Sequence, residues 1–333
     1  MPKTLSAKTL TRRPETVIAA RAPFDFAATA RFLRFTAAEL VDTFADGVYR
    51  RAWHFEDRLY LLSVAARGPA PRPELVITLA PAAGGTPVEA GAMTAAAQTV
   101  AHMFSVEHDL IRLAARVARD PLLRQLEAAH RGLRLARWPV LFEALVRSII
   151  MQQIATPVAI TLTRRLVERF GETLRVGAQT FHAFPRATTL ARADAEELRA
   201  LGLTGAKAAG IVALAQACAD GALDAAALAR ADNETIIARL TRLRGVGRWT
   251  AEWALVLYFG RADVFPAGDL FLRGVVAKYY NRGGALGERE VRQRAARRWG
   301  AWAGYAAVYF LAGMRAGTIT LRPARVLSSA PAA

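Results

Sequence analysis

Residues 243–269 read LRGVGRWTAEWALVLYFGRADVFPAGD, and this stretch decides the fold. A tight turn of Gly245, Val246 and Gly247 is expected to join two helices, and Asp269 is expected to begin a third. Glycine permits positive φ and lets the backbone come close to a ligand. The N–H groups of this turn, and the N-terminus of the helix from Arg248, therefore predict an anion site.

The charge of the chain indicates which anion this is. The 333 residues carry a formal net charge of +17, which favours nucleic-acid phosphate. Residues 1–100 hold 12 Lys+Arg and 9 Asp+Glu, a net of +3, and the remainder holds 33 and 19, a net of +14. A DNA surface is therefore expected in the later two-thirds. The alternative is that the arginines only reflect a GC-rich genome.

Several classes of protein are excluded by composition. The single cysteine, Cys218, excludes an internal disulfide and a Cys-ligated iron–sulfur cluster, and we interpret it as a small core residue. The five histidines show no metal-ligand spacing. No apolar run reaches about 18 residues, and residues 1–14 lack the apolar core of a signal peptide. We expect no membrane contact and a cytoplasmic location.

The N-terminal part has the period of strands. VYRRAWHF (48–55) and RLYLLSVA (58–65) are separated by two residues, which predicts a hairpin, and PELVITLA (73–80) predicts a third strand. APAAGGTP (80–87) is typical of a linker. We predict a small α+β domain here.

From about residue 98 the pattern is helical. Residues 102–120 have helical spacing and stop at Pro121, and 139–171 predict one or two long helices with a break at Pro157. Further helices fit 193–201, 205–219, 233–242, 248–259, 269–281, 287–299 and 304–315. The predicted fold class is α+β: a basic tail (1–14), an α+β domain (15–97), an all-α unit of two subdomains (98–322) and a C-terminal tail (323–333).

The order of these motifs resembles a known family. L-x-G-V-G-x-W-T-A followed by D-V-F-P-x-x-D resembles the helix-hairpin-helix GPD superfamily of base-excision DNA glycosylases, and within it the AlkA-like 3-methyladenine DNA glycosylase II family. GLRLARWPVLFEALVRSIIMQQIA (132–155) and LRALGLTGAKAAGI (198–211) resemble further family segments. The resemblance covers nearly the whole chain. It implies a fold in which the active site lies in the cleft between two helical subdomains.

Asp269 is the catalytic candidate that the resemblance implies. Taken alone, it is a well-suited helix N-cap, and capping is compatible with catalysis. Breaking an N-glycosidic bond develops positive charge on the sugar, which a carboxylate in a dry cleft stabilises. The same carboxylate can orient or deprotonate the attacking water. Asp263, six residues earlier, is expected to organise the loop.

Trp249 indicates which chemistry is used. Bifunctional members of the superfamily have a lysine at this place, whereas tryptophan cannot form a Schiff base, so the resemblance implies a monofunctional enzyme. Trp249 and Trp253 lie four residues apart, on one helix face, and their rings attract a cationic base; ordinary core packing is the alternative. A further aromatic of the family falls near Tyr305, Tyr309 and Leu311. Tyr305 is our predicted third pocket residue, and Leu311 is the best-aligned position, which puts a complete three-sided aromatic cage in question.

Two polar segments are predicted to contact DNA. Gln153 matches the side chain that fills the stack when a base is flipped, and Gln152 supports it; two solvated glutamines at a helix end are the alternative. Hairpin residues are predicted to bind phosphate, unless the turn is a plain connector. In the family, carbonyls corresponding to Thr241, Leu243 and Val246 also hold a monovalent cation, Na or K. The predicted phosphate-binding residues are Gly245, Val246, Gly247, Arg248 and Thr250.

These observations favour a monofunctional glycosylase that excises alkylated purines from double-stranded DNA. No organic cofactor or catalytic metal is implied, a monomer is expected, and DNA binding would associate the protein with a bacterial nucleoid. One alternative is a glycosylase for another lesion, such as a deaminated or etheno base. The other is a catalytically silent DNA-binding protein.

Overall fold

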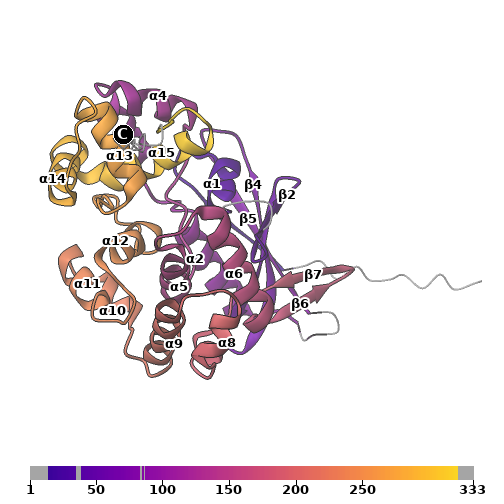
Figure 1. The fold of residues 1–333 in the computed structure, drawn as a ribbon. Coiled ribbons are helices and arrows are strands. Elements are labelled where there is room, and N and C mark those ends of the chain that lie inside the picture. The colour runs from indigo at the N-terminus through magenta and orange to yellow at the C-terminus, as the bar shows by residue number, and fades with distance from the viewer. Residues whose placement is uncertain (1–13, 35–38, 83–84, 86, 322–333) are drawn as a thin grey trace, which may run out of the picture.

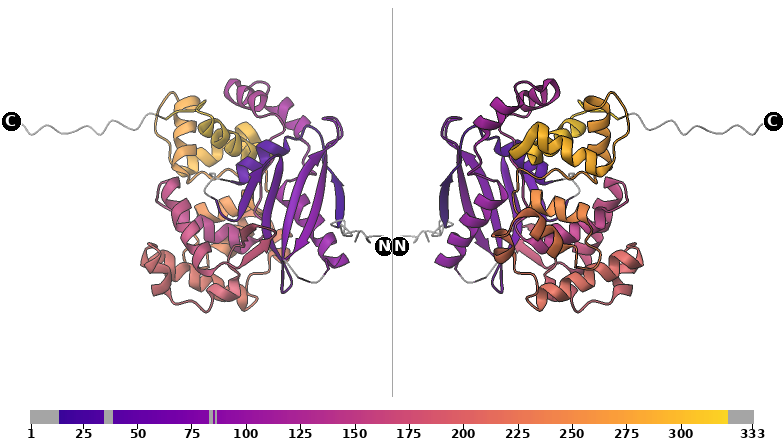
Figure 2. Two further views of the ribbon diagram at one scale, coloured as in Figure 1. Left: turned by 90° about the vertical axis from the view of Figure 1, so that its right-hand side faces the viewer. Right: turned by 90° about the vertical axis from the view of Figure 1, so that its left-hand side faces the viewer.

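The computed structural model describes residues 14–34, 39–82, 85 and 87–321. The tails predicted at 1–14 and 323–333 lie outside this part, except for Pro14. The described chain forms an antiparallel sheet on one side of the molecule and two groups of helices beside it (Figures 1 and 2). The α+β fold class is therefore confirmed.

The sheet has the strand order β1-β5-β4-β3-β2. The predicted hairpin is confirmed, since Phe55 pairs with Arg58 around a two-residue turn in which Glu56 has φ +50°. A second turn, at Asp46–Gly47, also has positive φ at both residues, a strong hairpin signal that the sequence analysis missed. The strands are β1 (Glu15–Ala19), β2 (Asp42–Ala45), β3 (Val48–Phe55), β4 (Arg58–Arg67) and β5 (Glu74–Pro81).

Two helices accompany the sheet, α1 (Phe26–Leu33) and α2 (Ala90–Met103), and α2 packs against β1 and β5. The expected domain boundary between residues 97 and 98 falls inside α2, so it corresponds to no break in the chain. Pro87, the last residue of the predicted linker, lies shortly before this helix, whose small residues Ala92 and Ala96 are fully buried.

The remaining helices form two subdomains, as predicted. In Figure 1, α4 and α13 to α15 lie in the upper part of the molecule, whereas α5, α6 and α8 to α12 lie below them. The first subdomain comprises α5 (Leu141–Met151), α6 (Thr156–Phe170), α7 (Ala187–Leu190), α8 (Ala195–Ala200), α9 (Gly205–Ala219), α10 (Ala225–Ala229), α11 (Asn233–Leu240) and α12 (Arg248–Leu257). The second comprises α3 (Leu110–Val117), α4 (Pro121–Ala129), α13 (Leu270–Tyr280), α14 (Glu288–Trp299) and α15 (Ala303–Arg315), with a short 3₁₀ turn at Gly300–Trp302.

Two expectations about this region are wrong. Residues 102–120 do not form one helix, because Asp109 caps a new helix, and Pro121 begins α4 instead of only ending a helix. The unit is also not all-α, because β6 (Thr173–Val176) and β7 (Gln179–His182) form a hairpin. Leu174 and Phe181 of this hairpin pack with Ala52 and Leu61 of the sheet.

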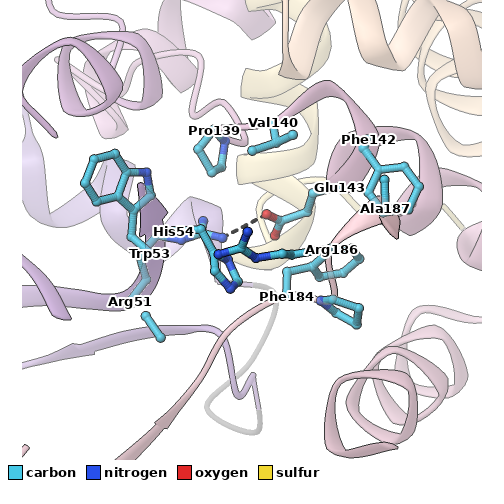
Figure 3. Close-up of a pocket in the computed structure, with 12 residues that line it drawn as sticks. Arg51, Trp53, His54, Pro139, Val140, Phe142, Glu143, Phe184, Arg186 and Ala187 are labelled. Atoms are coloured by element: carbon cyan, nitrogen blue, oxygen red, sulfur yellow. Dashed lines mark hydrogen bonds and ion pairs between the residues drawn. The ribbon is translucent and has the colours of Figure 1, made fainter. Parts of the chain in front are cut away.

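A buried ion cluster joins the sheet to α5. Arg51 of β3 donates to Asp42 at 3.1 Å and to Glu143 of α5 at 2.8 Å. Arg147 of α5 donates to Glu143 at 2.9 Å and to Glu39 at 3.0 Å. A hollow of about 230 Å³ lies beside the cluster, and Figure 3 shows the Arg51–Glu143 pair at its wall. All five side chains are buried and paired between the sheet and α5, so the loss of any one would leave an uncompensated buried charge at this contact.

Candidate active site

A cavity of about 320 Å³ lies where the two helical subdomains meet. One wall comes from α5 and α12 of the first subdomain, and the opposite wall comes from α13 and α15 of the second. Phe32 of α1 closes one side, so the N-terminal domain also contributes to the cavity. The lining residues are Phe32, Trp138, Ser148, Met151, Thr156, Trp249, Trp253, Leu257, Asp269, Phe271, Leu311, Met314 and Arg315.

Asp269 lies at the N-terminus of α13 and lines the cavity. Its Oδ1 accepts a hydrogen bond from the Leu272 amide at 3.1 Å, so the predicted capping role is present. Its Oδ2 accepts from the indole Nε1 of Trp249 at 3.2 Å and of Trp253 at 3.4 Å. All three donors are neutral, and the carboxylate is partly exposed, so it can face a ligand in the cavity.

The two tryptophans lie one turn apart on α12, on the same face, as the spacing predicts. Trp253 is 5% exposed and Trp249 is half-buried, and both line the cavity. They combine an aromatic wall with a donor for Asp269. Asp263 is exposed, accepts from Asn233 at 2.9 Å and is absent from the cavity lining, which agrees with its expected role in the loop.

Tyr305 is not part of the cavity, so its assignment to the base pocket is wrong. Its side chain is fully buried between helices, where its hydroxyl hydrogen-bonds the Nδ1 of His108 at 2.7 Å. Burial together with the charge of Arg137 lowers the pKa of His108 to about 4, so this contact is made by a neutral imidazole. Leu311, the best-aligned position, does line the cavity, and the third aromatic wall is therefore missing at this place.

The turn between α5 and α6, residues 152–155, is here called the wedge turn. Gln153 is exposed and has φ +55°, a left-handed conformation that is unfavourable for a glutamine. The side chain of Gln152 instead points back into the protein, where its Nε2 donates to the Gly245 carbonyl and to the Thr250 hydroxyl, each at 2.9 Å. The two glutamines therefore differ: Gln153 projects from the surface, and Gln152 anchors the turn to the hairpin.

The Gly245–Gly247 turn has the geometry expected of an anion site. Gly245 has φ +82°, Gly247 caps α12, and both are exposed, whereas Val246 is buried. Within the part of the chain that the structure describes, neither glycine amide donates a hydrogen bond. These N–H groups therefore remain available to an external acceptor. Gly245 also packs against Gly210 of α9, where a side chain on either residue would crowd the backbone.

Two other hairpin residues are placed differently from the prediction. Thr250 is fully buried and its hydroxyl accepts from Gln152, so a side-chain contact to phosphate is excluded. Arg248 forms ion pairs with Glu234 at 2.6 Å and with Glu252 at 3.0 Å. Its guanidinium is committed to these carboxylates, and in this arrangement only its position at the start of α12 favours an anion.

Several cavity residues were not identified from the sequence. Ser148 and Met151 lie on α5, one turn apart, and Met314 and Arg315 end α15. Ser148 and Met151 precede the two glutamines at helical spacing, which is a signal that could have placed them on the same side. No local signal identifies Arg315, whose guanidinium lies over the ring of Phe32 at 4.3 Å.

The described residues give no sign of a metal centre or of a membrane span. Within them, no group of three or more His, Cys, Asp or Glu side chains is placed to hold a metal ion. The same residues contain no helix that combines the length and apolarity needed to cross a membrane.

Comparisons with known proteins agree with this geometry. The chain is 29% identical over 287 residues to DNA-3-methyladenine glycosylase 2 of Escherichia coli, covering 86% of this chain and 93% of that protein. It is 28% identical over 206 residues to DNA-3-methyladenine glycosylase of Bacillus subtilis, covering 62% and 68%. The 3-methyladenine DNA-glycosylase structure from Archaeoglobus fulgidus superposes with a TM-score of 0.77 at 26% identity, covering 90% and 98%.

Two family models match separate parts of the chain. The AlkA N-terminal domain matches residues 16–138, which contain the sheet and α1 to α4. The HhH-GPD superfamily base excision DNA repair protein matches residues 146–301, which contain the wedge turn, the glycine hairpin and Asp269. The chain therefore belongs to the HhH-GPD superfamily of base excision DNA repair proteins and has an AlkA-type N-terminal domain.

Proposed function

We propose that this protein is a monofunctional DNA glycosylase that removes alkylated purines from double-stranded DNA. The observation that carries the proposal is the carboxylate of Asp269, which lines an aromatic cavity between two subdomains and is held by two indole donors. The relatives named above are 3-methyladenine glycosylases, and this supports the substrate class.

Asp269 supplies the chemistry of hydrolysis. As the bond from the sugar C1′ to the base nitrogen breaks, the base leaves with the electron pair and positive charge develops on the sugar. The Asp269 carboxylate stabilises this charge. Water then attacks C1′ and gives its proton to Asp269 or to solvent. The products are the free base and an abasic sugar with a hydroxyl at C1′.

A base alkylated on a ring nitrogen is positively charged and leaves as a neutral molecule. It therefore needs no dedicated acid. The ring faces of Trp249 and Trp253 attract such a cation. The reaction needs no amine nucleophile either, which is consistent with tryptophan at position 249.

One observation favours a second substrate class. Arg315 lines the same cavity, and burial lowers its pKa to about 10, so its guanidinium stays charged at neutral pH. The guanidinium donates to the Phe32 carbonyl at 3.1 Å. Its positive charge still disfavours a cationic base in the pocket relative to a neutral one. Neutral deaminated or etheno purines are therefore the alternative substrates.

DNA is held through its phosphates. The free amides of Gly245 and Gly247 are suited to one phosphate group, independent of sequence. The backbone carbonyl oxygens of Thr241, Leu243 and Val246 are also suited to bind a monovalent cation, Na or K, at the hairpin. In the described hydrogen bonds, the Thr241 and Val246 carbonyls accept none, while Leu243 accepts one from the Val246 amide. We propose that the protein acts as a monomer at chromosomal DNA.

The test is a screen of purified protein against duplexes that carry 3-methyladenine, 7-methylguanine, 1,N6-ethenoadenine, hypoxanthine or uracil. Alkylated purines should be released as free bases, with the abasic strand left uncut until alkali is added. Preference for the neutral purines would favour the second substrate class. Release of no base from any duplex, with DNA binding intact, would identify a silent DNA-binding protein. A borohydride-trapped adduct through one lysine would refute the monofunctional assignment.

A further inference from the structure

We propose that Lys207 is the positioning residue of the wedge turn, so that this lysine governs base flipping without taking part in bond cleavage. Its Nζ donates to the carbonyls of Ile150 at 2.8 Å and Gln152 at 2.7 Å. These carbonyls belong to the end of α5, where the last turn of a helix lacks internal partners and carries partial negative charge. The inference rests on the proposed function, since a wedge is needed only by a base-flipping enzyme.

Lys207 is itself held in place by the fold. It lies in the first turn of α9, where its amide donates to the side chain of Thr204, the N-cap residue. Helix α9 packs closely on α5 and, through Gly210, on the glycine hairpin. The ammonium group is therefore carried by a helix that also contacts the glycine hairpin.

The wedge turn is consequently tied at two points. Lys207 binds its backbone from α9, and Gln152 binds the Gly245 carbonyl and the Thr250 hydroxyl with its side chain. Between these ties, Gln153 keeps a left-handed φ of +55° and an exposed side chain. Such a conformation persists only where the surrounding contacts impose it. The two ties are the contacts that do so.

The choice of lysine at this position is chemically specific. The sequence holds 4 lysines and 41 arginines, so a basic residue in this chain is normally arginine. An ammonium group can donate to two converging carbonyls from a single point, whereas the planar guanidinium fork is suited to a carboxylate or phosphate. Lys207 donates to two neutral carbonyls, and burial lowers its pKa, which fits a structural donor better than a phosphate contact.

The experiment compares Lys207→Met, Lys207→Arg and Gln153→Ala with the matched control Lys278→Met. Lys278 is the second lysine of the described chain and also donates to a backbone carbonyl, that of Thr320 at 2.8 Å, at the far end of α13. Each variant is assayed for thermal unfolding, for single-turnover excision of one lesion in matched and mismatched pairs, and for unstacking of a neighbouring 2-aminopurine.

We expect Lys207→Met to slow excision from the matched pair about tenfold and from the mismatched pair much less, because the mismatch has already lost part of its stacking and pairing. Lys207→Arg should behave like Lys207→Met, and Lys278→Met should remain near wild type. The double variant Lys207→Met/Gln153→Ala should excise no more slowly than Gln153→Ala alone, because both changes impair the same insertion of Gln153 into the base stack.

Three outcomes would overturn the inference. If Lys207→Met slows excision equally in the matched and mismatched pairs, Lys207 does not act in base flipping. If Lys207→Met excises at the wild-type rate, Lys207 has no role in the reaction. A phosphate contact would be identified if Lys207→Arg kept full activity and DNA binding by Lys207→Met, but not by Lys207→Arg, depended less on salt. The aminopurine signal separates the two proposals: wild-type protein that unstacks the base without releasing it refutes the glycosylase but not the wedge.

Discussion

Asp120 and Asp269 occupy the same local position in two helices, yet their surroundings differ. Each caps a helix, accepts an amide hydrogen bond from the third residue beyond it, and accepts from at least one tryptophan indole. Asp120 also pairs with Arg298 at 2.8 Å and accepts from Tyr280 at 2.9 Å. Its charge is neutralised by these partners, and it does not line the cavity between the subdomains.

Asp269 has the cap and the indoles but forms no ion pair with any residue that the structure describes. Its oxygens face a cavity that can hold a ligand, and its donors are neutral. The comparison shows what distinguishes a candidate catalytic carboxylate from a structural one in this fold. The cap motif is common to both, and the missing arginine together with the adjoining cavity makes the difference. Substitutions at the two sites should therefore separate activity from stability.

The largest expected effect is on catalysis. Asp269→Asn should lower single-turnover excision by about 10³-fold or more, because the charge that stabilises the developing cation is removed. Asparagine caps helices as well as aspartate does, so thermal stability and binding to damaged DNA should change little. Rapid-quench measurement of base release under saturating enzyme checks this. Near-normal release by the variant would show that Asp269 is not the catalytic group.

The opposite outcome is expected at Asp120. Asp120→Asn should destabilise the fold by about 1–2 kcal/mol, since it weakens hydrogen bonds made to a charged group whose arginine partner is partly exposed to solvent. Excision per folded molecule should remain at the wild-type level. Urea unfolding and single-turnover assays on the same preparation measure both quantities. A large loss of excision without a loss of stability would contradict the structural role.

The sequence could predict most of the elements that form through local interactions. Alternation and a two-residue turn located β3 and β4, and helical spacing located α9 and α11 to α15. The β6–β7 hairpin was missed because its short strands depend on packing against a distant sheet, through residues such as Phe181 and Leu61. Such contacts are not visible in a local pattern.

The site could be predicted only in part, for a related reason. Asp269 and the two tryptophans follow from their motif. Tyr305 was misplaced because residues 303–310 of α15 are buried on all sides, so periodicity does not show which face meets the cavity. The cavity residues Ser148 and Arg315 come together only when α5 and α15 pack across from each other. Their role depends on tertiary structure that the spacing does not encode.

The contribution of Asp120 to the free energy of unfolding should depend on pH in the acidic range. Burial alone would raise the pKa of this carboxyl, but hydrogen bonds from Arg298, the Leu123 amide and Trp299 lower it below the usual value of 3.8. A carboxyl whose pKa is lower in the folded state than in the unfolded state stabilises the fold at pH values above its unfolded-state pKa. This stabilisation is lost as the pH falls through the folded-state pKa. The difference in unfolding free energy between wild type and Asp120→Asn should therefore be constant above about pH 5 and shrink below about pH 4. A difference that stays constant down to pH 3 would contradict this assignment.

The smallest effects should come from the indoles, and they complete the comparison. Trp249→Phe keeps an aromatic ring in the cavity but removes the donor that lies 3.2 Å from Asp269, whereas Trp299→Phe removes the donor that lies 3.2 Å from Asp120. A hydrogen bond to a charged group contributes roughly 1.5–3 kcal/mol at ideal geometry, and these bonds are long, so each change should cost about 1 kcal/mol. At Trp249 this loss should appear as excision slowed about fivefold, because the carboxylate is less well oriented for the sugar. At Trp299 it should appear as lower thermal stability with an unchanged excision rate. If both variants lose stability and neither loses activity, the indole of Trp249 serves packing only, and the orientation of Asp269 depends on its helix cap.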